Sequence, residues 1–134
     1  SKMEKTNLKY RAKVTHIGEL VTEFIDAGIL VFFGEQAPQE LRDFSIIHDG
    51  KELKADLEKG DVLYLDHVPY EILSIGPVAN QNFANLGHLV VKFNGALEPE
   101  MPGDVTVANQ KPHDVKIGSV IEIVSGQAPE EQGG

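Results

Sequence analysis

The 134-residue sequence contains no cysteine, and this absence excludes several classes of protein at once. Without thiols the chain can form no disulfide scaffold, no thiolate zinc site and no cysteine nucleophile. Long apolar runs are missing too: the longest, Gly28 to Gly34, is far shorter than the roughly 20 residues of a membrane-spanning helix. The amino-terminal residues have no hydrophobic core for export. We therefore expect a cytoplasmic protein without direct membrane insertion.

Basic residues are few relative to acidic ones, with 12 Lys and Arg against 21 Asp and Glu and a formal net charge of −9. Such a surface repels phosphodiester backbones and anionic lipids, so we expect no nucleic-acid partner. It favours encounter with a basic protein partner, although acidity also keeps proteins soluble.

Sequence motifs for nucleotide binding and for serine catalysis are also missing. The chain has no G-x-G-x-x-G, no Gly-Lys-Ser or Gly-Lys-Thr, and no G-x-S-x-G pattern. The five histidines are spread one per segment, without the spacings of metal ligands: His16, His48, His67, His88 and His113. The sequence therefore predicts neither a metal site nor a cofactor.

The length predicts a single domain over residues 1–134, with a core at about 8–125 and disordered ends at 1–6 and 126–134. Apolar residues alternate with polar ones from Leu8 to Thr15, and Ile29 to Phe33 is continuously apolar. About eight such short strands, separated by turn residues, indicate a mainly β domain, an antiparallel barrel or sandwich. Leu20 to Ile25 is a less regular segment.

One or two short helices are expected in addition to the strands. Pro38 suits a first helical position shortly before Phe44. Val78 to Leu86 predicts about two helical turns with Phe83 and Leu86 facing inward, followed by Gly87 in a left-handed conformation. A polar loop is the alternative for this segment, because it holds several asparagines.

His48 is the main candidate for chemistry, because it ends a short apolar strand that includes Ile46 and Ile47. Asp49-Gly50 predicts a tight hairpin turn directly after it. Core packing would then hold the stem of the histidine while one ring nitrogen faces solvent. The alternative is a polar residue that only marks the end of the strand.

The other histidines have weaker claims to a function. His88 follows a helix-capping glycine, where it can orient a neighbour, accept a proton, or serve the structure alone. His16 ends a strand, and His67 and His113 lie in turn or loop segments, so we expect these three to be solvated.

Several segments taken together resemble one family, the glucitol/sorbitol-specific enzyme IIA component of the phosphoenolpyruvate-dependent sugar phosphotransferase system. The resemblance extends from about Tyr10 to Ile123. It is carried by Phe33 through Gly50, Glu52-Leu53-Lys54, Tyr70 with Ile75-Gly76 and Val78-Ala79, Leu86-Gly87-His88, Phe93-Asn94-Gly95, Pro102-Gly103 with Val105 and Val107, and Gly118-Ser119-Val120.

The resemblance implies a compact β-barrel phosphocarrier in which His48 is the catalytic residue. HPr would be the phosphoryl donor, and the IIB and IIC components of a sorbitol permease would be the acceptors. Transfer needs a neutral imidazole with one exposed lone pair and its other nitrogen bonded to an acceptor. The amides around Asp49 to Lys51, with the Lys51 charge, are candidates to stabilise the phosphoryl oxygens. Two other classes remain open: a non-catalytic β-barrel interaction module and a small sugar- or metal-binding barrel.

Overall fold

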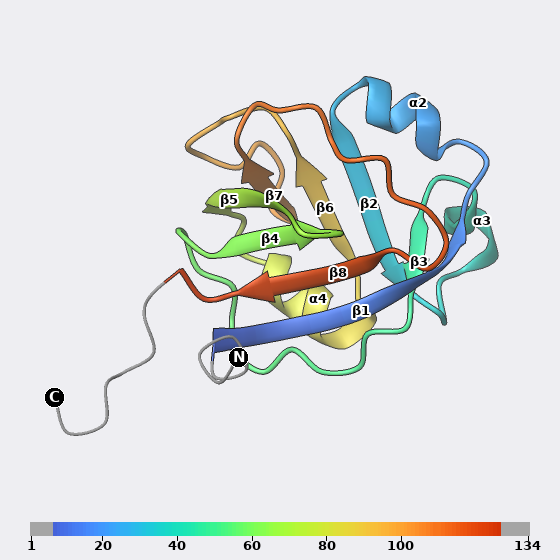
Figure 1. Ribbon diagram of the computed structural model, residues 1–134, viewed down its shortest axis with the longest axis horizontal. Coiled ribbons are helices and arrows are strands. Elements are labelled where there is room, and N and C mark those ends of the chain that lie inside the picture. Colours follow the sequence, from blue (N-terminus) through green and yellow to red (C-terminus); the bar gives the residue numbers. More distant parts are fainter. Residues whose placement is uncertain (1–6, 127–134) are drawn as a thin grey trace, which may run out of the picture.

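The computed structural model describes residues 7–126 and shows a closed eight-stranded β-barrel with three short helices (Figure 1). Around the barrel the strands follow the order β1-β3-β2-β6-β7-β5-β4-β8. The strands are β1 (Leu8–Ile17), β2 (Ile29–Gly34), β3 (Ile46–His48), β4 (Val62–Leu65), β5 (Val68–Ile75), β6 (Leu89–Lys92), β7 (Asp104–Val107) and β8 (Val120–Val124). The helices are α2 (Val21–Asp26), α3 (Gln39–Arg42) and α4 (Ala79–Leu86). The predicted mainly β barrel is thus confirmed.

The alternation in β1 builds one wall of the barrel. Tyr10, Ala12 and Val14 are buried in the core, whereas Arg11 and Lys13 are exposed. This pattern is what a strand with one face on the core requires. β1 pairs with β8 on one side and with β3 on the other, so the first and last described strands close the barrel.

Two of the eight strand pairs are parallel, which corrects the expectation of a purely antiparallel barrel. β2 runs parallel to β3, and β6 runs parallel to β7. Parallel neighbours need a crossover connection, because a tight hairpin can join only antiparallel strands. Between β2 and β3 that crossover contains α3, and between β6 and β7 it is the proline-containing segment 93–103.

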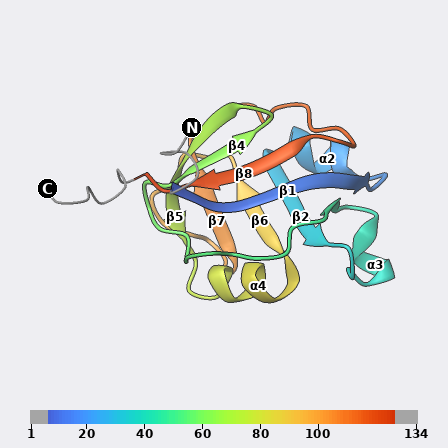
Figure 2. The same ribbon diagram turned by 60° about the horizontal axis from the view of Figure 1, so that its bottom comes forward.

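Residues 7–126 contain three helices, one more than the one or two that were expected. Leu20 to Ile25 was expected to be irregular, but α2 forms there because Val21 packs into the core and Phe24 stacks near Phe44, with ring centroids 5.5 Å apart. α4 lies at one end of the barrel, which is at the bottom of Figure 2. Its Phe83 is buried as expected, whereas Leu86 is 40% exposed, so the inward placement of Leu86 was wrong.

The hairpin expected at Asp49-Gly50 is not formed. After β3 the chain continues through residues 49–61 without regular structure and runs beside β1 and α4 to reach β4 (Figure 2). Leu57 is its buried core contact. The ends predicted to be disordered lie outside the described residues, except for Gly126.

Candidate functional site

His48 is the last residue of β3, and strand alternation sets the direction of its side chain. Ile47 packs on the outer side of the barrel with Phe33, so His48 points inward, as Ile46 does. The imidazole lies edge-on to Tyr10, with ring centroids 5.8 Å apart, and 6.5 Å from the ring of Phe83 on α4. β3 and α4 thus bring His48 to the end of the barrel that α4 covers.

Gly87 ends α4 and lies directly against the imidazole. Its φ of 65° is left-handed, a conformation that favours glycine, and this confirms the predicted helix end. A Cβ atom here would lie 2.9 Å from Cε1 and 3.0 Å from Nε2 of His48. Glycine is therefore required at this position both by the backbone turn and by the closeness of the histidine ring.

Both ring nitrogens of His48 have hydrogen-bond partners. Nε2 lies 2.8 Å from the carbonyl oxygen of Gly87, and the Gly50 N–H donates to Nδ1 over 3.0 Å. A carbonyl can only accept and an amide N–H can only donate, so the neutral ring carries its proton on Nε2 and its lone pair on Nδ1. The geometry thereby fixes a single tautomer.

The ring is also far less accessible than the sequence suggested. His48 is 1% exposed, so the expectation of a solvent-facing ring nitrogen was wrong. The physical reason is that residues after β3 fold back over the ring instead of turning away in a hairpin, which places the Gly50 amide on Nδ1. Burial lowers the pKa of His48, partly opposed by the Gly87 hydrogen bond and by the charges of Asp49 and Glu35, so the ring is neutral at pH 7.

A pocket of about 180 Å³ reaches the imidazole from the surface. Three segments line it: the end of β2 with Glu35 and Gln36, residues 48–51, and the last turn of α4. Its side chains include two carboxylates, Glu35 and Asp49, and one cation, Lys51. The Lys51 side chain expected near the histidine is therefore present at the pocket.

The segment 49–61 is attached to the barrel at points along its length. At its start, the Asp49 N–H donates to the Lys13 carbonyl, and the Asp49 carboxylate accepts from the Lys13 N–H at 2.7 Å. Near its middle, the Lys54 N–H donates to the carbonyl of Lys9 over 2.9 Å. These bonds extend the pairing along β1 beyond β3, which is why the segment follows that strand.

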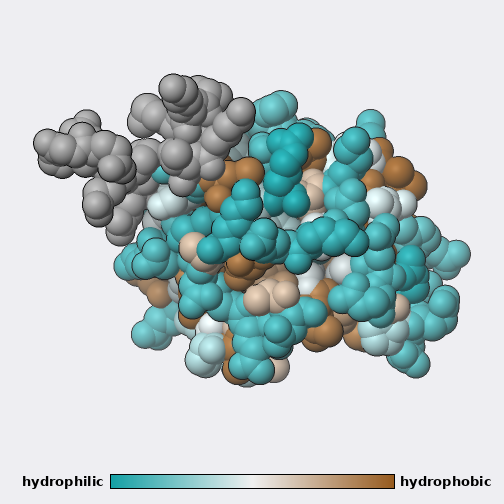
Figure 3. All heavy atoms as spheres, turned by 90° about the horizontal axis from the view of Figure 1, so that it is seen from below, coloured by the Kyte–Doolittle hydropathy of each residue, from teal (hydrophilic) through white to brown (hydrophobic). Residues whose placement is uncertain are grey.

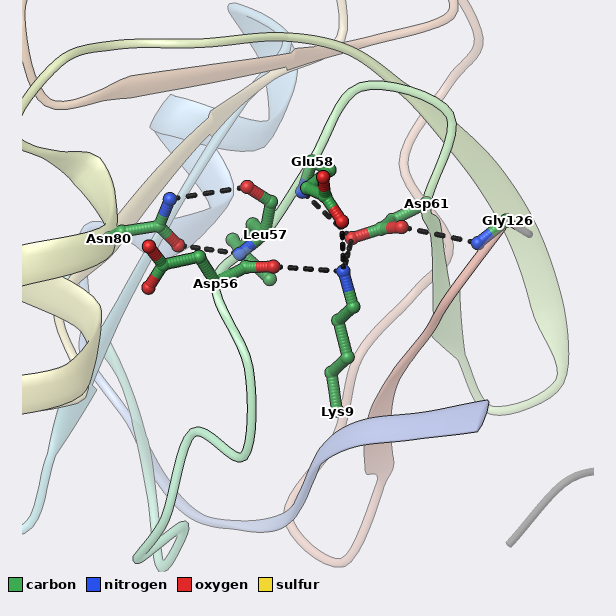
Figure 4. Close-up of polar contacts among 7 residues, drawn as sticks. All are labelled: Lys9, Asp56, Leu57, Glu58, Asp61, Asn80 and Gly126. Carbon is green, nitrogen blue, oxygen red and sulfur yellow. Dashed lines mark hydrogen bonds and ion pairs between the residues drawn. The ribbon is translucent and has the colours of Figure 1, made fainter. Parts of the chain in front are cut away.

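The far end of the segment holds a buried ion pair (Figure 4). Lys9 points outward from β1, yet its side chain is only 8% exposed, because residues 56–61 cross over it. Its ammonium group lies 2.8 Å from Oδ2 of Asp61 and donates to the Asp56 carbonyl at the same distance. Asn80 of α4 accepts from the N–H of Leu57 and donates to its carbonyl, over 2.6 and 3.2 Å.

The other histidines do not join His48 around the pocket. His16 is exposed, and His67 lies in the β4–β5 turn with a φ of 73°. His113 was expected to be solvated, but its Nε2 lies 3.2 Å from the Asp66 carboxylate. Hydrogen bonds from Ser119, Val120 and His113 lower the pKa of Asp66 and outweigh its burial, which acts in the opposite direction. Within residues 7–126, no group of three or more His, Asp or Glu side chains is placed to hold a metal ion.

Sequence reasoning missed the parts of the site that come from distant segments. Glu35 and Gln36 follow β2, and their place at the pocket depends on the parallel pairing of Gly34 with His48. The carbonyl of Gly87 was not foreseen as a partner of the imidazole either. The Leu86-Gly87-His88 segment did carry a signal, since a helix-ending glycine places backbone carbonyls at a defined point.

Comparison with solved structures defines the fold first. The fold matches the crystal structure of a phosphotransferase-system IIA component from Enterococcus faecalis V583, with a TM-score of 0.77 and 24% sequence identity. The match covers 85% of this chain and 98% of the other. The closed barrel with α4 across one end is therefore the fold of that IIA component.

Sequence comparison then identifies the particular family. The profile of the family described as PTS system glucitol/sorbitol-specific IIA component matches residues 9–122. The glucitol/sorbitol-specific EIIA components of Shigella flexneri and Escherichia coli K12 are 36% and 35% identical over 116 residues, covering 87% of this chain and 94% of each relative. The chain belongs to the glucitol/sorbitol-specific IIA family of the sugar phosphotransferase system, as its sequence segments indicated. Membership supports a role as a phosphocarrier in such a system.

None of the helices in residues 7–126 has the length and apolar character needed to cross a membrane. The face of the molecule seen from below in Figure 3 is mainly hydrophilic, with apolar side chains only in separate areas.

Proposed function

We propose that this chain accepts a phosphoryl group from phosphorylated HPr on His48 and passes it to the cognate IIB domain for uptake of sorbitol. In this role the protein works in the cytoplasm, between HPr and the IIB and IIC components of a permease. The observation that supports His48 most directly is its neutral imidazole, held in one tautomer at a surface pocket by Gly87 and Gly50. Of the five histidines, His48 alone lines this pocket.

The transfer forms a nitrogen–phosphorus bond on His48 and breaks the corresponding bond on the donor histidine. An attacking ring nitrogen must present a free lone pair, and the Gly50 N–H occupies the lone pair of Nδ1. Attack from Nδ1 therefore requires the Gly50 amide to move away, while attack from Nε2 requires both ring hydrogen bonds to open. Either route makes movement of the Gly50 amide part of the reaction.

The pocket supplies limited charge for a phosphoryl group, which carries nearly two negative charges. Lys51 attracts it, whereas Glu35 and Asp49 repel it. Once the Gly50 amide has left the ring, this N–H and its neighbours can donate to phosphoryl oxygens instead. The same amide thus protects the resting ring and stabilises the product.

The experiment is a transfer assay with phosphoenolpyruvate, enzyme I and HPr, read by mass spectrometry of the intact chain. We expect the mass of one phosphate to be gained, in a form labile to acid and stable to base. His48→Gln should abolish the gain, while the matched variant His113→Gln should retain it. A wild-type chain that gains no phosphate, or a His48→Gln chain that still does, would contradict the proposal.

The two other classes of protein predict different experimental results. A non-catalytic interaction module gains no phosphate at any histidine. A metal-binding barrel melts at a higher temperature with added zinc or manganese, because a ligand that binds only the folded state stabilises it. A salt titration adds a further check on the carrier role: with a net charge of −9, binding of a basic donor surface should weaken as ionic strength rises.

A further inference from the structure

His88 lies between the end of α4 and the start of β6, immediately after Gly87. Its imidazole is half-buried, and its Nδ1 lies 3.2 Å from the carbonyl oxygen of Phe32. The ring also stacks on that of Phe33, with centroids 4.4 Å apart and planes 26° apart. Because a carbonyl only accepts, Nδ1 is the donor and the ring is fixed in position from two directions.

The peptide bond that joins Gly87 to His88 connects this ring to the candidate site. The carbonyl oxygen of that peptide is the atom that accepts from Nε2 of His48. A peptide unit is planar, so its carbonyl direction is set by the backbone on both sides. On the Gly87 side the backbone is permissive, because glycine adopts many conformations at little cost.

Backbone hydrogen bonds tie this peptide to the last turn of α4. The Gly87 N–H donates to Phe83 over 2.9 Å, and the His88 N–H donates to Asn82 over a long 3.4 Å. On the other side the pairing of Leu89 with Phe32 holds the backbone, and the side chain of His88 adds a contact with Phe32 and Phe33 of β2. β2 therefore holds the Gly87–His88 peptide through a side chain on the outer side of the barrel.

We propose that His88 is a positioning residue for His48. By fixing the Gly87–His88 peptide, it aims the Gly87 carbonyl at Nε2 and so, together with the Gly50 N–H on Nδ1, keeps the proton of His48 on Nε2. The chain of contacts runs from the Phe32 carbonyl through the His88 ring and the Gly87 carbonyl to His48. The effect on phosphoryl transfer rests on the function proposed above, whereas the effect on the tautomer of His48 does not.

Two variants separate this role from simple packing. His88→Phe keeps an aromatic ring on Phe33 but removes the donor to Phe32. His88→Asn loses the stacking but keeps an N–H donor at about the position of Nδ1. A purely structural role predicts that His88→Phe is the milder change, while a positioning role predicts that His88→Asn is.

Nitrogen NMR of histidine-labelled protein reads the tautomer of His48 directly. In the wild type we expect the Nε2–H form alone, and in His88→Phe a mixture with the Nδ1–H form. His88→Asn should restore the wild-type spectrum of His48. Transfer from phosphorylated HPr should slow about tenfold in His88→Phe and recover in His88→Asn, the lower end of the losses seen when a partner that orients a metal-bound imidazole is removed.

A His88→Phe spectrum in which His48 keeps only its Nε2–H form would overturn the proposal, as would a failure of His88→Asn to restore that form. If His88→Phe does not fold, measurements on the wild-type protein alone still test the proposal. Couplings across hydrogen bonds, from His88 Nδ1 to the Phe32 carbonyl and from His48 Nε2 to the Gly87 carbonyl, must both be present, and absence of either one rejects the inference. Wild-type protein that shows the expected tautomer yet takes up no phosphate would contradict the proposed function alone.

Discussion

The segment that joins β3 to β4 is held very differently at its two ends. At residues 56–61 a buried ion pair of Lys9 and Asp61 and the paired amide of Asn80 fix it to β1 and α4 (Figure 4). At residues 49–51 Asp49 is bonded to Lys13 through its N–H and its carboxylate, the Gly50 N–H reaches the His48 ring through a single hydrogen bond, and the Asp49 and Lys51 side chains are exposed. The buried anchor lies where the segment has no proposed chemistry, so Gly50 and Lys51 can move without breaking it.

The largest expected effect comes from breaking the anchored end. Lys9→Met leaves the Asp61 carboxylate, itself 3% exposed, without its cation. Removing one partner of a buried pair typically costs about 3–5 kcal/mol, a large part of the total stability of a domain. Urea denaturation should show a loss of this size. Lys13→Met, at an exposed position on the same strand, is the control. An equally small change in the free energy of unfolding of both variants would show that the ion pair is not an anchor.

A smaller loss should follow from removal of the amide that brackets Leu57. Asn80→Ala leaves the N–H and carbonyl of this buried residue without the partners they have in the wild type. Unsatisfied buried groups cost about 1–3 kcal/mol, so we expect a loss of about 2 kcal/mol in the free energy of unfolding. Asn85→Ala, an exposed position of the same helix, should change stability by less than about 0.5 kcal/mol. Equal free energies of unfolding in the two variants would contradict this prediction.

Substitution at residues 49–51 should instead change the rate of phosphoryl transfer and leave the stability of the fold nearly unchanged. Lys51→Ala removes the single cation of the pocket, so transfer to His48 should slow about tenfold, or about 1.4 kcal/mol in the barrier. Its melting temperature should stay close to that of the wild type. Lys54→Ala, an exposed lysine of the same segment outside the pocket, serves as the matched control. An unchanged transfer rate in Lys51→Ala would remove this residue from the mechanism.

The smallest effect concerns the pH dependence of stability. Burial lowers the pKa of His48 in the folded protein below the value of about 6.5 expected in the unfolded chain. The unfolded state therefore binds more protons in this window, and stability should fall as pH decreases from about 6.5 towards the folded pKa, then level off. Asp66 acts at lower pH, since its own pKa is lowered from 3.8. Urea titrations of wild type and His48→Gln at several pH values test this, and an equal slope in both would contradict it.

The sequence predicted the local elements of this fold well because their signals are local. The alternation of apolar and polar residues predicted β1, the continuous apolar run predicted β2, and Gly87 predicted the end of α4. α2 was missed although Val21, Phe24 and Ile25 have helical spacing, since six residues make a weak pattern. The parallel pairing of β2 with β3 depends on packing between distant strands, which no local pattern encodes.

At the candidate site the sequence singled out His48 but not its surroundings. Asp49-Gly50 has the composition of a hairpin turn, yet long-range hydrogen bonds to Lys13 and to the imidazole override that preference. Gly50 is also confined by Tyr10, whose ring and hydroxyl oxygen lie too close to leave room for a Cβ atom. Such contacts exist only after the barrel closes, so the burial of His48 could not be read from the residues around it.

Closure of the barrel also limits how another protein can attach. Each of the eight described strands has a neighbour on both sides, so none of them is an edge strand. Recognition by addition of an extra strand, a common mode for open sheets, is therefore closed to partners at this part of the chain. A donor or acceptor domain must instead be recognised through side chains and loops, and exchanging loop residues should redirect the carrier while its strands stay intact.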